Sequence, residues 1–204
     1  MYWILGIIVV GLLLNFFLSD NTPDEITCDT AAKQSVRALV DSVEENFESV
    51  MQRVREELQN PHEQFPENFT QQEAKDHFLI YVFSLETRAV HNLFESDIRD
   101  NLNELRVKYL SELTDIPEDR INREEEKYLQ KIEQDIENGM DPFSTAGGVV
   151  YDLLDNMGFK KATFNAKLDI VGYDLQLVFA VNIITTEHAK TIKHMRENYD
   201  IVPE

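Results

Sequence analysis

Histidines and carboxylates spaced for metal binding are the first candidates for chemistry in this chain. Glu73 and His77, and His91 and Glu95, are four residues apart, so each pair falls on one face of a helix and could share a metal ion. The sequence has no HExxH, no paired cysteines and no Glu-x-x-His, which carboxylate-bridged di-iron bundles require. Glu/His pairs at this spacing are typical of surface electrostatics. We therefore predict no metal site and no cofactor.

Motifs for nucleophilic or phosphate chemistry are equally scarce. The stretch "STAGGVV" lacks the lysine and the spacing of a phosphate-binding loop, and no Gly-x-Ser-x-Gly elbow occurs. Cys28 is the only cysteine, so no intramolecular disulfide can form. We predict no catalytic residue, although an active site assembled from distant residues leaves no local signature.

The net charge narrows the range of partners. There are 38 acidic and 19 basic residues, giving a net charge of −19 and a pI of about 4.6. Such a field repels phosphates and anionic lipid headgroups, which excludes nucleic acid as an expected partner. A basic protein surface or cations would be favoured, and the acidic residues also serve as a solubilising coat.

The opening segment predicts a membrane anchor over residues 1–19. Tyr2 to Leu18 carries no charge and would span roughly 25 Å as a helix, within the lower range for crossing a bilayer. It lacks the basic start and the small-residue cleavage site of a secretory signal. Tyr2 and Trp3 would lie at the interface. Asn15, one turn after Gly11, would either bond across helices or reach toward the interface.

The sequence predicts the orientation in the membrane less directly than it predicts the anchor. The first basic residues after the anchor are Lys33 and Arg37, and the nearer flank is acidic. Because no lysine or arginine lies directly after the anchor, the C-terminal part of the chain can be exported, and we slightly favour this orientation. In the alternative, the short N-terminal tail crosses the membrane and the C-terminal part stays in the cytosol. We expect a single-pass protein of a bacterial inner membrane.

After a linker at residues 20–29, residues 30–158 predict an α-helical domain. Its first helix, capped by Asp29 or Thr30 and ended before Pro61, carries an apolar seam in alternating steps of four and three residues. The seam is a candidate interaction surface, for the chain's own next helix or for oligomerisation, and comprises Val36, Val40, Val43, Phe47, Val50 and Val54.

Further helices follow a joint containing Pro61 and Pro66. A capping box at Thr70–Glu73 opens a long helical pattern to about Leu113, with a break expected near "ESDIRDN". "NREEEKYLQKIEQDIENG" predicts another helix, with Tyr128, Ile132 and Ile136 facing inward and Gly139 as its C-terminal cap. "DPFSTAGGVVYDLLDNMG" predicts a shorter one.

In residues 159–204, apolar residues first recur at every second position, which is typical of β-strands. Residues 162–170 and 175–184 alternate as the two strands of a hairpin around Gly172, followed by a final helix and a "YDIVPE" tail. The second strand is apolar on both faces, which suits cover by helices or, as the alternative, a docked strand from "DIVPE", a second copy or a partner. Val178 and Ala180 mark the candidate strand edge.

The predicted fold class is thus mainly α: one transmembrane helix, an α-helical bundle, and a β-hairpin with a final helix. The expected function is a non-catalytic, membrane-anchored interaction or assembly protein that docks a protein partner or self-associates. Two alternatives stay open: a membrane factor of the phage lysis or immunity type, and an enzyme whose site shows no local motif.

Overall fold

A computed structural model describes residues 24–57, 71–139, 156 and 191–203 of the chain. These residues are mainly α: five helices pack as a bundle beside a small two-stranded parallel sheet. The elements are β1 (Asp24–Thr27), α2 (Cys28–Glu57), α3 (Gln71–Leu93), α4 (Ser96–Thr114), α5 (Glu118–Glu137) and β2 (Tyr199–Val202). Residues 191–198 form the fifth helix.

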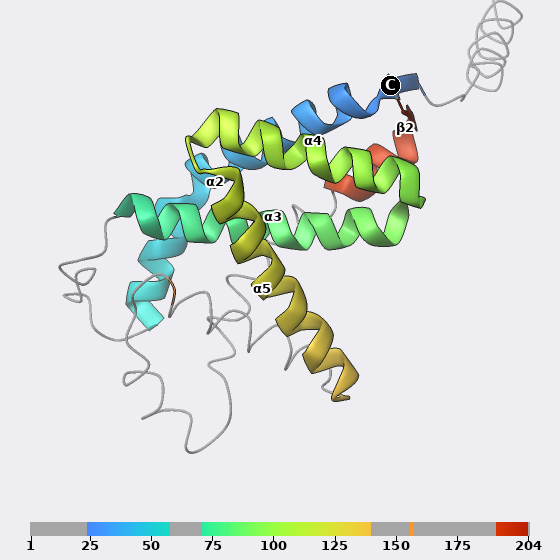
Figure 1. Ribbon diagram of the computed structural model, residues 1–204. Helices are drawn as coiled ribbons and strands as arrows, with labels where there is room; N and C mark the ends of the chain where they lie inside the picture. Colours follow the sequence, from blue (N-terminus) through green and yellow to red (C-terminus); the bar gives the residue numbers. More distant parts are fainter. Residues whose placement is uncertain (1–23, 58–70, 140–155, 157–190, 204) are drawn as a thin grey trace, which may run out of the picture.

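Helix α3 lies at the centre of the bundle. Figure 1 shows α3 and α4 running antiparallel, α2 lying along α4, and α5 crossing α3 at a steep angle. The stretch "HFLIYVFS" is nearly all apolar, which predicts burial around the whole circumference of a helix rather than on one face. Residues 78–84 are accordingly all buried. The single apolar stripe expected from the sequence is therefore too narrow for this helix.

The break between α3 and α4 falls where it was expected. Glu95 is extended, with φ −71° and ψ 161°, and it precedes α4 as its N-cap residue. The amide of Phe94 still donates to Val90 O at 3.1 Å, so the chain leaves α3 and re-enters helix within two residues. This tight connection places α3 and α4 as antiparallel neighbours.

Single residues determine where α4 and α5 end. Asp115 takes a left-handed conformation with φ 59°, and Pro117 then precedes α5. Gly139 has φ +74° just after α5, which a residue with a side chain rarely adopts. The prediction that Gly139 caps this helix is confirmed. Tyr128 and Ile132 face the core as expected, but Ile136 is 45% exposed because it lies near the end of α5.

Helix α2 starts earlier than the sequence suggested. The amide of Thr30 donates to Thr27 Oγ1 at 3.3 Å, so Thr27, rather than Asp29 or Thr30, caps the helix. Asp29 lies in the first turn, where its charge suits the helix dipole. Its carboxylate accepts a hydrogen bond from the Tyr109 hydroxyl, which ties the start of α2 to α4.

The sheet joins two segments that the sequence assigned to a linker and a tail. β1 pairs with β2 in parallel, with Asp24 opposite Tyr199 and Ile26 opposite Ile201. Ile201 is buried, so the side chain of the C-terminal strand belongs to the core. The interpretation of "YDIVPE" as a tail is wrong for residues 199–202, because pairing with β1 satisfies their backbone.

Of the predicted C-terminal segment, the structure describes residues 191–203. The predicted hairpin, including Val178 and Ala180, lies outside the described residues. The final helix is present over residues 191–198, and Ile192 and Met195 face the core.

Candidate functional site

The predicted anchor lies outside the described residues. This applies to Tyr2, Trp3, Gly11 and Asn15, and to the whole of residues 1–19. Within residues 24–57, 71–139 and 191–203, no helix combines the length and the apolar character needed to cross a bilayer.

The apolar seam of α2 faces the chain's own bundle. Val36, Val43 and Phe47 are buried, and Val40 packs partly buried against the same core. The Phe47 ring lies 6.2 Å from that of Phe78 on α3, measured between centroids. The side chains of Val50 and Val54 lie outside the described set. The described part of the seam is thus used to hold α2 against α3 and α4.

The histidines of the two Glu/His pairs lie in different surroundings. His77 Nδ1 lies 3.1 Å from Glu124 Oε2 on α5, and His91 faces a separate surface. Among the described residues, no cluster of three or more histidine, cysteine or acidic side chains is arranged to hold a metal ion.

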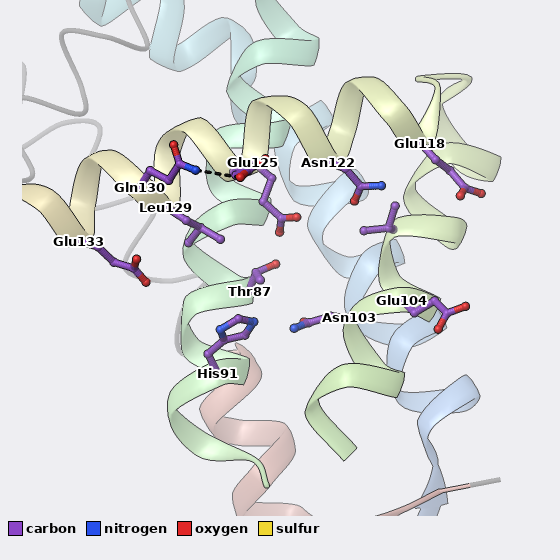
Figure 2. Close-up of a pocket in the computed structure, with 12 residues that line it drawn as sticks. Thr87, His91, Asn103, Glu104, Glu118, Asn122, Glu125, Leu129, Gln130 and Glu133 are labelled. Carbon is purple, nitrogen blue, oxygen red and sulfur yellow. Dashed lines mark hydrogen bonds between the residues drawn. The ribbon is translucent and has the colours of Figure 1, made fainter. Parts of the chain in front are cut away.

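Among the described residues, a groove with a volume of about 590 Å³ lies between α3, α4 and α5. We call it the acidic groove (Figure 2). Its lining contains no lysine or arginine. The acidic residues that line it are Glu104 on α4 and Glu118, Glu125, Glu126 and Glu133 on α5. Its other lining residues are Thr87, His91, Asn103, Val107, Asn122, Leu129 and Gln130.

A buried ion pair lies beneath this groove. Arg106 Nη2 donates to Glu86 Oε2 at 2.5 Å, and both side chains are fully buried. Arg106 Nη1 donates to Thr87 Oγ1 at 3.3 Å, and the guanidinium stacks over Phe83, 4.5 Å from the ring centroid. These contacts fix Thr87, which belongs to the groove wall, to the core.

Glu125 is the most deeply placed carboxylate of the groove. It is 9% exposed, whereas the other groove glutamates are exposed. Figure 2 shows its carboxylate directed from α5 toward Thr87, while Asn103 extends from α4 toward Thr87 and His91 on the other side. Within the described part of the chain, the buried atoms Glu125 Oε1 and Asn103 Oδ1 have no hydrogen-bond partner.

Burial changes the acidity of two carboxyls here. Burial raises the pKa of Glu86 to about 7, although the charge and the hydrogen bond of Arg106 act in the opposite direction. Burial likewise raises the pKa of Glu125, against the smaller effects of the Thr87 hydrogen bond and the Arg106 charge. Glu125 is therefore held closer to neutrality than an exposed glutamate.

A second polar network holds α5 across the bundle. Arg120 on α5 bridges Asp76 on α3 and Glu124 on its own helix, at 3.1 Å to each carboxylate oxygen. Burial raises the pKa of Glu124, but the hydrogen bonds and charges of His77 and Arg120 together lower it by a larger amount. The pKa of Glu124 is therefore below its ordinary value. These ion pairs position the first turns of α5 and hence the acidic groove.

Sequence reasoning missed Glu86, Arg106 and Glu125, although two of them leave a signal. Glu86 stands between Val82 and Val90 at steps of four, and Arg106 stands four residues after Leu102, so both occupy core-facing positions of their helices. Complementary charges at core positions of adjacent helices predict a buried ion pair. Glu125 lies within "EEE", and nothing in that run singles it out.

No protein-family model, curated protein or solved structure matches the chain.

Proposed function

We propose that the chain is a non-catalytic, membrane-anchored interaction protein, and that its acidic groove docks a basic segment of a protein partner. The observation that carries this proposal is a groove of about 590 Å³ between three helices whose described lining contains five glutamates and no lysine or arginine. A lysine- or arginine-rich segment is the occupant whose charge matches this lining. Anchoring by residues 1–19 would hold the groove beside the membrane.

The three helices that form the groove are held firmly enough for the groove to recognise a segment of defined shape. The Glu86–Arg106 pair and the Arg120 bridges join α3 to α4 and to α5 through charged contacts with little exposure. A binding site on helices that are fixed by packing and by supporting hydrogen bonds keeps its geometry better than a site on loops. The groove therefore supports docking of a defined segment rather than diffuse attraction alone.

The enzyme alternative would need two titratable groups with opposed environments facing one pocket. Glu125 meets half of this requirement, because its pKa is raised in the groove. Of the described carboxyls with a lowered pKa, Glu124 contacts His77 and Arg120 and Asp100 contacts Arg99, and neither lines the groove. The pair does not converge, which favours binding over acid–base catalysis.

The test uses a synthetic lysine-rich helical peptide and two charge-matched variants of the full chain in uncharged detergent. The groove variant carries Glu104→Gln, Glu126→Gln and Glu133→Gln, all exposed groove positions. The control carries Glu25→Gln, Glu45→Gln and Glu112→Gln, exposed positions outside the groove. Both variants lose the same charge, so general attraction falls equally in both.

We expect the groove variant to bind the peptide about tenfold more weakly than the unmodified chain, since exposed charge contacts are worth up to about 1 kcal/mol each. The control variant should change affinity much less. Equal losses in the two variants would identify the acidic residues as a general coat and contradict the proposal.

A further inference from the structure

Two acceptor atoms that line the acidic groove point to the chemistry of its occupant. Glu125 Oε1 and Asn103 Oδ1 are buried, and neither has a hydrogen-bond partner within the residues described. Buried polar atoms in proteins nearly always have a partner. The two residues come from α5 and α4 and line the same groove, and in Figure 2 their side chains are directed toward Thr87 from either side. What suits both acceptors is a hydrogen-bond donor.

The charge of the surroundings selects the donor further. In the part of the chain that the structure describes, the groove lining supplies carboxylates and no lysine or arginine, and Arg106 below it is directed to Glu86 and Thr87. A charged donor forms stronger hydrogen bonds to a carboxylate than a neutral one does. The donor that suits this position is therefore cationic.

An ammonium fits the geometry better than a guanidinium. A guanidinium pairs best with both oxygens of one carboxylate, but the unpartnered acceptors here are single oxygens on two different residues. An ammonium has three donors that point in different directions, so it can reach acceptors on two helices at once.

We propose that Glu125 and Asn103 form a recognition site for one alkylammonium group, supplied by a lysine side chain of the docked segment. This inference rests on the proposed function for the source of the ammonium. The site itself is defined by the two acceptors, so it can be tested with small ions.

The experiment records nuclear magnetic resonance spectra of the full chain in uncharged detergent during titration with three monovalent cations. n-Butylammonium supplies the proposed group, methylguanidinium supplies planar donors, and tetramethylammonium carries the same charge without any N–H donor. The signals followed are the Asn103 side-chain amide and the Glu125 carboxyl carbon. We expect n-butylammonium to bind about tenfold more tightly than tetramethylammonium, the difference that a hydrogen bond to a charged group provides, with methylguanidinium in between.

Glu125→Gln should remove this preference, whereas the control Glu112→Gln should retain it. Glu112 is an exposed glutamate on α4 that lies outside the groove lining. Equal binding of the three cations, or an unchanged preference in Glu125→Gln, would overturn the site.

Spermidine distinguishes a docked lysine from a free polyamine. A site for one ammonium should bind spermidine with an affinity within a few-fold of that for n-butylammonium. A gain of about a hundredfold would mean that several groove carboxylates chelate one polyamine, and it would overturn the docked lysine as the source.

The outcomes also separate the two proposals. If the lysine-rich peptide depends on the groove glutamates but the small cations show no preference at Glu125, docking stands and the ammonium site is wrong. If n-butylammonium selects Glu125 but the peptide does not distinguish the charge-matched variants, the ammonium site stands, while protein docking and the lysine source are both wrong.

Discussion

Arg106 Nη2 lies 2.5 Å from Glu86 Oε2, and neither side chain is exposed to solvent. The pair joins α4 to α3 in the interior of the bundle, directly beneath the acidic groove. Desolvating two charges is unfavourable, so such a pair adds little net stability compared with apolar residues of similar size. Its effect is instead that removal of either side chain leaves the other one buried without its partner.

Removing one partner of this pair should therefore destabilise the bundle strongly. We expect Glu86→Leu alone to lower the free energy of unfolding by about 3–5 kcal/mol, because it leaves the Arg106 charge buried without its partner. Arg106→Met should lower it by less, because Glu86, whose pKa is already raised to about 7, then becomes neutral. The double variant should lose much less than the sum of the two. Urea unfolding of the full chain, followed by far-ultraviolet circular dichroism, measures all three. Additive losses would show that the two side chains are not coupled.

The raised pKa of Glu86 predicts how stability depends on pH. Its pKa is about 7 in the folded chain against an ordinary value of 4.5, so the folded state holds this proton more tightly. The free energy of unfolding should therefore fall as pH rises from about 5 to about 7. Glu124, with a lowered pKa, acts in the opposite direction only as pH falls toward and below its ordinary 4.5.

The slope between pH 5 and 7 should become smaller in Glu86→Gln. If that variant is too unstable to measure, the titration of the Glu86 carboxyl carbon in the unmodified chain gives the same answer. A Glu86 midpoint at the ordinary value for glutamate, or an increase in stability over this range, would contradict the prediction.

The register of the small sheet predicts where a disulfide can form. Asp24 lies opposite Tyr199 in the parallel pair. With Cys28 replaced by serine, Asp24→Cys and Tyr199→Cys should oxidise readily to a disulfide, as seen by non-reducing electrophoresis. The control, Asp24→Cys with Val202→Cys, displaces one cysteine by roughly 10 Å along the strand. Comparable oxidation of both pairs would mean that this register is wrong.

Peptide binding to the acidic groove should depend on the protonation of Glu125. Because burial raises the pKa of Glu125, mild acid neutralises it before the exposed glutamates. Affinity for the lysine-rich peptide should therefore rise with pH through and above the ordinary range for glutamate. His91 also lines the groove, so the measurement is made with His91→Gln present throughout.

In that background, Glu125→Gln should flatten the pH profile of peptide affinity, and Glu126→Gln should leave its midpoint in place. Identical profiles for the chain with and without Glu125 would rule out this carboxylate as the titrating group.

Local sequence signals predicted the helices well and the contacts between them poorly. The break after Leu93 and the cap at Gly139 follow from residues that act on their own helix. The pairing of β1 with β2 depends on segments far apart in the chain, and four residues carry too little periodicity to announce a strand. In the groove, Glu86 and Arg106 could have been recognised as charges at core positions. Glu125 could not, because its burial depends on α3 and α4, which pack against α5.

The most direct test of partner docking is to map the lysine-rich peptide on the full chain by nuclear magnetic resonance. Docking predicts backbone amide shifts concentrated at groove residues of three helices, such as Thr87, Asn103 and Leu129. The exposed acidic face of α2, around Glu45, should change little. Shifts spread evenly over the acidic surface, or centred on α2, would contradict the acidic groove as the docking site.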